Sequence, residues 1–274
     1  HRVDRRQRQM CIRDRIWCST RDRGSSMVSE TPAAGSVCIV GAGPGPADLM
    51  TLRALNRLKQ AQVVVHDRLI AEDVLALIPA AARRVYVGKA LGHHAVPQEE
   101  IHDLLVGYAR QGLRVVRLKG GDPYVFGRGG EEVLALQAAG IAFEVVPGVT
   151  AASGCSAAAG IPLTHRHLAA SCVFLPGHLA DDQASHDWQA LAGAGQTRVF
   201  YMGVQRLAQI AQALIAHGLP PDTPAAIVQD GARPTQSVLA HPLRRLVEIA
   251  PPYGPRPGLL IIGETVRLSP SFEE

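Results

Sequence analysis

The chain has 274 residues, 47% of them hydrophobic, which is enough for one large domain or two ordinary ones around a substantial core. No apolar run approaches the roughly 20 residues of a membrane-spanning helix. The formal net charge is +4, but residues 1–26 contain eight arginines and three aspartates, so the remainder carries −1. The basic composition therefore does not indicate a nucleic-acid-binding surface.

The N-terminal stretch, residues 1–36, is predicted to be a disordered or spurious basic extension. It does not begin with Met, and it has neither apolar periodicity nor the apolar centre of a secretory signal. Its three aspartates argue against an arginine-rich transit peptide. Met27 is a plausible natural start.

Cysteine and histidine usage argues against disulfide and metal scaffolds. The five cysteines, an odd number without a C-x-x-C pair, are Cys11, Cys18, Cys38, Cys155 and Cys172. They favour neither a disulfide framework nor a structural zinc site and fit a reducing compartment, for which we expect the cytoplasm. No recognisable zinc set is formed by His93, His94, His165, His167 and His178, so no metal is expected.

From residue 37 to residue 149 the chain alternates short apolar runs with helical spacing, which is typical of a parallel sheet covered on both faces. The expected strands are Val37–Val40, Val63–Val65, Val85–Val87, Val115–Leu118 and Phe143–Val146. The expected helices are Thr51–Gln60, Glu72–Ile78, Glu99–Gln111 and Gly130–Ala139.

A different pattern begins after Pro147. Residues 151–160 are mostly small and fit either a tightly packed helix or a loop close to a ligand. The later connections are more varied, which favours a mixed sheet with strands at Cys172–Leu175, Thr197–Met202, Ala225–Gln229, Ser237–Ala240 and Gly258–Ile262. We expect an α/β fold with an N-terminal domain over residues 37–149 and a C-terminal domain over residues 150–268, joined between 147 and 168.

The first expected strand leads into V-G-A-G-P-G-P, residues 40–46, which can be interpreted as a dinucleotide loop. Asp67, at the end of the second apolar run, would then take the place of a ribose-binding acid. However, Pro46 replaces the last glycine of G-x-G-x-x-G, and Pro44 and Pro46 lack the N–H groups that bind a pyrophosphate. What remains is a tight turn, either close to a ligand or without one.

Residues 117–132, R-L-K-G-G-D-P-Y-V-F-G-R-G-G-E-E, contain five glycines directly after an expected strand. Such a loop lines the ligand crevice of an open α/β sheet. Asp122 is typical of a turn residue. Arg128 can bind a substrate carboxylate or pair with Glu131 or Glu132 on the next turn.

This stretch, together with G-A-G-P-G at 41–45 and V-P-G-V-T-A-A-S-G-C-S-A-A-A-G-I-P-L-T-H-R at 146–166, resembles the uroporphyrinogen-III C-methyltransferases of the tetrapyrrole methylase family. The likeness runs from about Val37 to Leu268. It implies a two-domain α/β fold with S-adenosylmethionine in a cleft between the domains, and a homodimer. It also implies methylation of uroporphyrinogen III at C2 and C7, which gives precorrin-2 for sirohaem or cobalamin synthesis and two molecules of S-adenosylhomocysteine.

The resemblance also assigns roles by position. Asp67 corresponds to a proton acceptor and Lys89 to a proton donor. Cofactor contacts are implied for Pro44, Gly120, Gly121, Asp122, Val125, Thr150, Ala151, Met202 and Gly231. Plainer interpretations exist, since Asp67 can be a turn acid, Lys89 a surface lysine and Met202 a core residue.

The implied substrate carries eight carboxylates, which guanidinium groups match in geometry. We therefore expect Arg68, Arg128 and Arg166 to bind it. Two positions depart from the family pattern, which usually has Tyr at His66 and an acid at Pro46.

The alternatives are a methylase of a later corrin intermediate, an RNA methylase of the same fold, an NAD-dependent dehydrogenase and a non-catalytic cofactor-binding module. The R-L-K-G-G-D-P motif argues against the first, and the missing basic stripe argues against the second. The prolines of residues 40–46 argue against the third, and Asp67 with Lys89 argues against the fourth. Only 36 residues precede Val37, so we expect another protein to supply the oxidase–chelatase module that some relatives carry.

Overall fold

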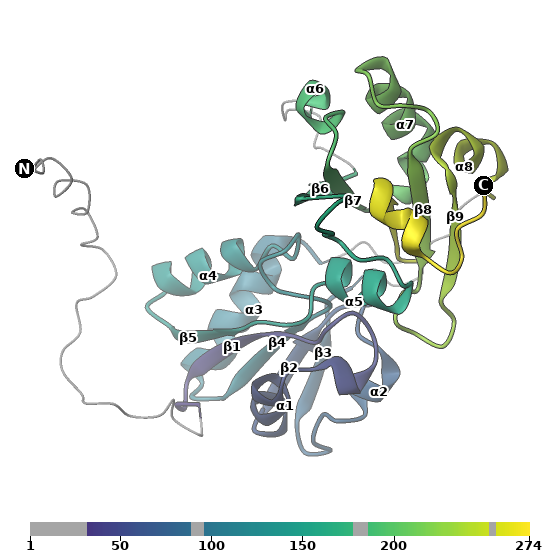
Figure 1. Ribbon diagram of the computed structural model, residues 1–274. Coiled ribbons are helices and arrows are strands. Elements are labelled where there is room, and N and C mark those ends of the chain that lie inside the picture. The colour runs from purple at the N-terminus through teal and green to yellow at the C-terminus, as the bar shows by residue number, and fades with distance from the viewer. Residues whose placement is uncertain (1–31, 89–95, 178–185, 252–255) are drawn as a thin grey trace, which may run out of the picture. The chain divides into compact units, whose positions relative to one another are not determined.

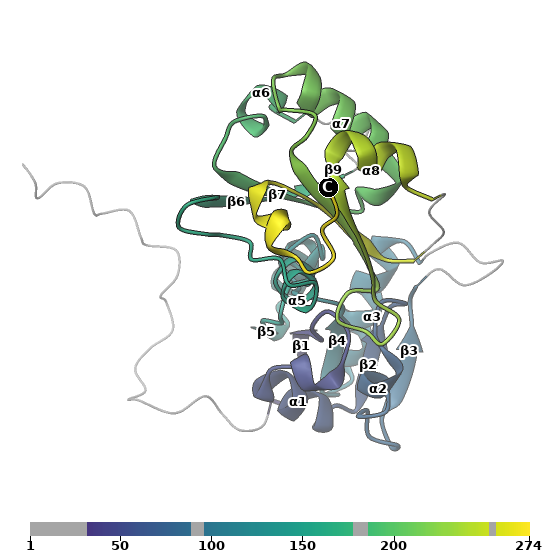
Figure 2. The same ribbon diagram turned by 45° about the vertical axis from the view of Figure 1, so that its right-hand side comes forward.

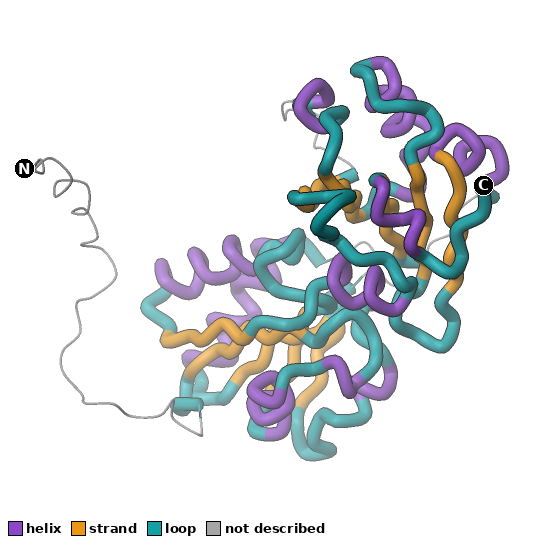
Figure 3. Tube along the Cα trace, in the orientation of Figure 1, coloured by secondary structure: helices purple, strands orange, loops and turns teal. Residues whose placement is uncertain are grey.

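The computed structural model describes residues 32–88, 96–177, 186–251 and 256–274. Within these ranges no helix is long and apolar enough to cross a membrane. The strands form two five-stranded sheets, drawn in orange in Figure 3. The predicted two-domain α/β class is confirmed, while the bounds of the domains stay a prediction.

The first sheet is parallel throughout, in the order β3-β2-β4-β1-β5. Its strands are β1 (Ser36–Gly41), β2 (Val63–His66), β3 (Arg83–Tyr86), β4 (Val115–Lys119) and β5 (Ala142–Val146). All five predicted apolar runs coincide with strands of this sheet. The central strands β1, β2 and β4 are buried along their whole length, as expected of short continuous apolar runs, whereas the edge strand β3 is largely exposed.

Helices cover both faces of this sheet (Figure 1). Helices α1 (Leu52–Lys59) and α2 (Glu72–Leu75) pack on one face, and α3 (Gln98–Arg110) and α4 (Gly129–Ala138) pack on the other. Successive side chains of β1 point to opposite faces of the sheet. Cys38 and Val40 therefore pack in the core with α1 and α2, and Val37 and Ile39 pack in the core with α3 and α4.

The second sheet is mixed, as predicted, in the order β6-β7-β10-β8-β9. Strands β6 and β7 are parallel and the other pairs are antiparallel. Its strands are β6 (Ser171–Pro176), β7 (Gln196–Tyr201), β8 (Pro224–Gln229), β9 (Ser237–Pro242) and β10 (Gly258–Ile262).

Two different helical layers cover the mixed sheet. Helices α6 (Trp188–Leu191), α7 (Leu207–Ala216) and α8 (Leu243–Ile249) lie together on one face (Figure 2). The other face packs against α5 (Ala151–Ala158) and the 3₁₀ helix η3 (Glu264–Leu268). The small residues at 151–160 thus form a helix rather than a loop, and Ala152 and Cys155 belong to its apolar contact with the sheet.

Candidate active site

A cavity of about 820 Å³ lies where the parallel strands β1, β2 and β4 reach their carboxyl ends. Residues that follow β7 and β8, and residues at the start of β10, complete its wall. Both sheets therefore contribute to one site. Its volume falls within the roughly 300–1,000 Å³ of small-molecule pockets, and its place at the strand ends is where open α/β sheets bind ligands.

The structure brings together every residue that the sequence proposes as a cofactor contact. The cavity is lined by Pro44, Gly120, Gly121, Asp122, Val125, Thr150, Ala151, Met202 and Gly231. Asp67, Arg68 and Arg128 line it as well. The roles of these residues stay predictions, but residues up to 187 positions apart now share one pocket.

The loops after β1 and β4 are joined by backbone hydrogen bonds. The Gly43 N–H donates to the Gly121 carbonyl at 3.2 Å, and the Gly121 N–H donates to the Gly43 carbonyl at 2.7 Å. Helix α1 begins only at Leu52, after the short 3₁₀ helix η1 (Ala47–Leu49). Because residues 40–46 neither lead directly into α1 nor keep the Gly43 N–H available for a phosphate, the dinucleotide interpretation is wrong.

Asp122 fixes the glycine-rich loop after β4. Its Oδ1 accepts a hydrogen bond from the Tyr124 N–H at 2.8 Å, as expected of a turn residue. Its Oδ2 accepts one from the Gly148 N–H at 3.1 Å. A Cβ atom on Gly148 would lie 2.3 Å from the Gly121 carbonyl oxygen, so only glycine permits this backbone contact.

Tyr201, at the end of β7, ties the mixed sheet to the start of α5. Its hydroxyl lies 2.5 Å from the Thr150 Oγ1 and accepts a hydrogen bond from the Ala152 N–H at 2.9 Å. Burial raises the pKa of this phenol above its ordinary value. Tyr201 itself lines the cavity, and it was not among the predicted site residues.

Left-handed backbone conformations gather at this cavity. Four non-glycine residues on its wall have positive φ: Phe126 (52°), Arg128 (57°), Met202 (56°) and Asp230 (47°). Each costs on the order of 1–3 kcal/mol, and such conformations cluster at ligand sites. Met202 is also 63% exposed, which contradicts its interpretation as a core residue.

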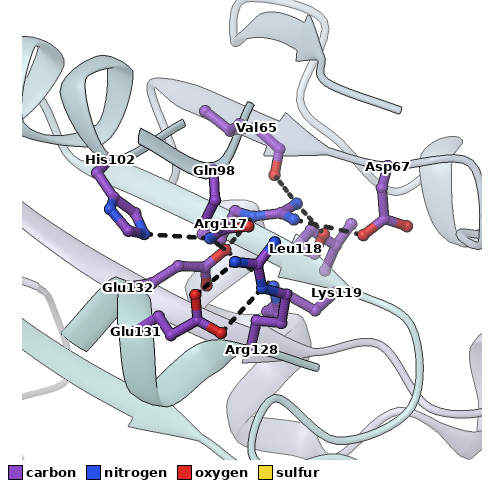
Figure 4. Close-up of polar contacts among 10 residues, drawn as sticks. All are labelled: Val65, Asp67, Gln98, His102, Arg117, Leu118, Lys119, Arg128, Glu131 and Glu132. Carbon is purple, nitrogen blue, oxygen red and sulfur yellow. Dashed lines mark hydrogen bonds and ion pairs between the residues drawn. The ribbon is translucent and has the colours of Figure 1, made fainter. Parts of the chain in front are cut away.

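A buried charge network, drawn in Figure 4, adjoins the cavity through Asp67, Arg117 and Lys119. Arg117 and Lys119, on β4, both donate to Oε1 of the fully buried Glu132, at 3.0 Å and 2.9 Å. Arg117 also reaches Oδ2 of Asp67, at 3.4 Å. Burial, and next the charge of Arg117, lower the pKa of the Lys119 ammonium.

Sequence reasoning did not assign this network, although a signal was present. Arg117 interrupts, and Lys119 directly follows, an apolar run that was expected to be buried on both faces of a sheet. A charged side chain in such a strand needs a buried partner or a ligand. Arg233 and Arg256 also line the cavity without having been predicted. Arg256 pairs with Asp230 at 2.7 Å, and Arg233 donates to the Leu69 carbonyl at 2.7 Å.

Arg128 forms the ion pair that the sequence allows, while its contact with a substrate carboxylate stays a prediction. It lines the cavity and pairs through two nitrogens with Glu131, at 2.9 Å and 2.5 Å. This pair raises the pKa of Arg128 and lowers that of Glu131, chiefly through the hydrogen bond between them. Both side chains are about half exposed, at 56% and 49%, so the guanidinium remains accessible to an anion.

Other predicted residues lie elsewhere. Arg166 is exposed between α5 and β6 and is not among the described residues that line the cavity. Lys89 lies outside the described residues, as do His93, His94 and His178. Within the described ranges, no three His, Cys, Asp or Glu side chains form a group that could hold a metal ion.

The two departures from the family pattern have local structural consequences. His66 is buried, and its ring meets the Tyr86 ring edge-on at 5.6 Å between centroids. Pro46 precedes η1, where the Ala47 N–H donates to Oδ2 of Asp73 at 2.8 Å. The Asp73 carboxylate on α2 therefore accepts the hydrogen bond of this turn, next to the position where the family usually has an acid.

The fold and cavity define a class: a two-domain α/β protein with one small-molecule site built from strand-end loops of a parallel sheet and from loops of a mixed sheet. Residues 36–247 match the model of the Tetrapyrrole (Corrin/Porphyrin) Methylases. The chain therefore belongs to the tetrapyrrole methylase family.

Similar proteins agree with this placement. Siroheme synthases from Edwardsiella ictaluri and Methylococcus capsulatus are 53% and 54% identical over 86% and 87% of this chain, and 51% of each relative is covered. The chain thus spans about half the length of these relatives. A crystal structure of uroporphyrin III C-methyl transferase from Thermus thermophilus is 45% identical, with a TM-score of 0.73 and coverage of 85% of this chain and 99% of that one. A form of that enzyme complexed with S-adenyl homocysteine matches equally well.

Proposed function

We propose that this chain is an S-adenosylmethionine-dependent methyltransferase that converts uroporphyrinogen III to precorrin-2 by methylation at C2 and then C7. The observation that carries the proposal is the convergence in one cavity of all nine positions matched to cofactor contacts, together with Asp67. The similarity to the Thermus enzyme over almost its whole length supports the same activity.

The cavity suits the methyl donor in size and chemistry. The glycine loop after β4 lets a ligand approach the backbone closely at Gly120 and Gly121, while Met202 and Val125 offer apolar contacts. When bound, S-adenosylmethionine supplies an electrophilic methyl group on a sulfonium. We assign Thr150, which contacts the Tyr201 hydroxyl, the adjacent Ala151, and Gly231, which follows β8, to its binding.

The remaining chemistry requires positioning and proton transfer. Carbon–carbon bond formation at an electron-rich pyrrole carbon breaks the sulfur–methyl bond, and the macrocycle then loses a proton as its double bonds rearrange. Asp67 lines the cavity with a side chain that is 26% exposed, so its carboxylate can reach both the substrate and the solvent. We assign it as the proton acceptor and Lys89 as the proton donor.

Substrate carboxylates require cations at the cavity. Arg68 and Arg128 line it, and Arg166 is the third proposed contact. Replacing each with Ala should raise the KM for the tetrapyrrole while the affinity for S-adenosylmethionine is retained, because a guanidinium binds carboxylates in a paired geometry. Unchanged kinetics in all three variants would contradict this assignment.

The decisive test is an anaerobic incubation of the chain with S-adenosylmethionine and uroporphyrinogen III, followed by mass spectrometry of the tetrapyrrole. A gain of two methyl groups is expected. No gain with the cofactor still bound would redirect the search to a later corrin intermediate. That alternative is supported by the structure of a cobalt precorrin-4 methyltransferase, which is 25% identical to this chain with a TM-score of 0.72.

The product would feed sirohaem or cobalamin synthesis, and the siroheme synthase relatives favour the first branch.

We also propose a cytoplasmic homodimer. The free thiols of Cys38, Cys155 and Cys172 fit a reducing compartment. Light scattering after size-exclusion chromatography tests the dimer, which a monomer mass at micromolar concentration would refute.

A further inference from the structure

Glu132 is the most deeply buried carboxylate of the charge network beside the cavity. It lies on α4 with no exposed surface, and it is not among the described residues that line the cavity. Its Oε1 accepts from the Arg117 Nε, the Lys119 Nζ and the Gln98 Nε2. Its Oε2 has no hydrogen-bond partner within the described part of the chain. Burying a carboxylate with one oxygen unused is costly, so the arrangement needs an explanation.

The Arg117 guanidinium is held in one orientation by contacts on all three of its nitrogens. Nε points at Glu132, and Nη1 donates to the Leu118 carbonyl at 3.1 Å and the Val65 carbonyl at 3.4 Å. Nη2 is then directed at the Asp67 Oδ2 at 3.4 Å (Figure 4). Because the guanidinium is planar, fixing Nε and Nη1 fixes the direction of Nη2.

Asp67 is in turn oriented through both of its oxygens. Oδ2 faces the Arg117 Nη2, and Oδ1 accepts the Leu69 N–H at 3.0 Å. The 3.4 Å contact with Arg117 is longer than the 3.0 Å contact between Arg117 and Glu132. The guanidinium therefore lies closer to Glu132 than to Asp67, but it still contacts and orients the Asp67 carboxylate.

We propose that Glu132 is a positioning residue for the methyl-transfer reaction: it anchors Arg117 so that Asp67 is oriented toward the substrate without being drawn into a close ion pair. This inference rests on the proposed function. Without the Glu132 carboxylate, Asp67 is the nearest carboxylate in the network for the buried Arg117. A closer pair would turn the Asp67 oxygens away from the cavity and remove them from proton transfer.

The test is E132Q, a substitution of equal size that removes the charge. Active sites are counted by S-adenosylhomocysteine titration, so that kcat refers only to folded protein. We expect kcat per binding site to fall about 10- to 100-fold, since a misplacement of about 1 Å has effects of this order. We expect the KM values for both substrates to stay within about twofold.

The matched control is E144Q. Glu144 is a half-buried carboxylate on β5 that pairs with the buried Arg57 at 2.6 Å and does not line the cavity. E144Q should lower the melting temperature and leave kcat per binding site unchanged. A merely structural role for Glu132 would give E132Q the same behaviour and would overturn the proposal.

A second variant keeps the test decisive if E132Q does not bind the cofactor. R117K retains a cation for Glu132 but lacks the planar fork that reaches Asp67, so it should lose kcat to the same extent. Full kcat in R117K would overturn the inference. These outcomes can be distinguished from failure of the proposed function, because in that case the unmodified chain itself would not methylate uroporphyrinogen III.

Discussion

The two sheets contribute different things to the cavity. The parallel sheet supplies Asp67, Arg117 and Lys119, whereas the mixed sheet supplies Tyr201, Met202 and a backbone strained at Asp230. Most of the charged groups lie on the parallel side, because the carboxyl ends of its strands all open at the same edge, while Asp230, Arg233 and Arg256 come from the mixed sheet. The proposed proton acceptor therefore comes from the parallel sheet alone, whereas the proposed cofactor contacts come from both sheets.

The largest effect should come from D67N. Loss of a general base typically costs about 10²–10⁴-fold, so kcat should fall by at least 10²-fold while S-adenosylhomocysteine affinity, measured by titration calorimetry, changes less than about twofold. The control D48N removes the same charge from an exposed site on η1 that does not line the cavity, and should behave as the unmodified chain. Weakened cofactor binding in D67N would show that Asp67 holds the cofactor rather than serving proton transfer alone.

The next largest effect, on the free energy of unfolding, should come from alanine substitution of the adjacent Gly129 and Gly130 at the start of α4. A Cβ on Gly129 would lie 2.6 Å from the Pro123 carbonyl oxygen, whereas one on Gly130 would meet nothing within 4 Å. G129A should therefore destabilise the protein by about 1–3 kcal/mol through overpacking. G130A, inside α4, should stabilise it by about 0.5–1 kcal/mol. Equal melting temperatures for the two variants would show that the loop around Pro123 can shift to accommodate a Cβ atom on Gly129.

Y201F probes the contribution of the mixed sheet. It removes the hydroxyl that contacts Thr150 and accepts from Ala152, at an expected cost of about 1–2 kcal/mol in unfolding free energy. S-adenosylhomocysteine affinity should fall a few fold, with kcat at saturation nearly unchanged. The control is Y108F, on α3 and outside the cavity wall. A kcat loss as large as that of D67N would place Tyr201 in the chemistry instead.

The smallest effect concerns strain at Met202. M202A keeps the positive φ, while M202G relieves it, so M202G should be more stable than M202A by about 1 kcal/mol in chemical denaturation. Both variants should bind S-adenosylhomocysteine a few fold more weakly, because both lose an exposed side chain on the cavity wall. M202A as stable as M202G would mean that the left-handed backbone carries no cost at this position.

The sequence by itself determined where the strands of both sheets lie, because apolar runs and their periodicity indicate which segments are buried, whereas the order of the strands came from the structure. The glycine-rich loop after β4 likewise predicted a ligand site, since it follows a strand whose carboxyl end has a fixed place in the sheet, whereas the individual cofactor positions came from the family resemblance. Asp122 as a turn residue was also accessible, because its partner Tyr124 is two positions away.

Only the tertiary structure decided the partners of the charged groups. Arg117 meets Asp67 across 50 residues and Glu132 across 15, and no local pattern encodes which carboxylate a buried cation will choose. The same holds for Arg166, whose motif places it beside cavity residues in the sequence but whose side chain lies on an exposed segment. Periodic burial is a local property, whereas electrostatic pairing depends on distances that only the packed chain fixes.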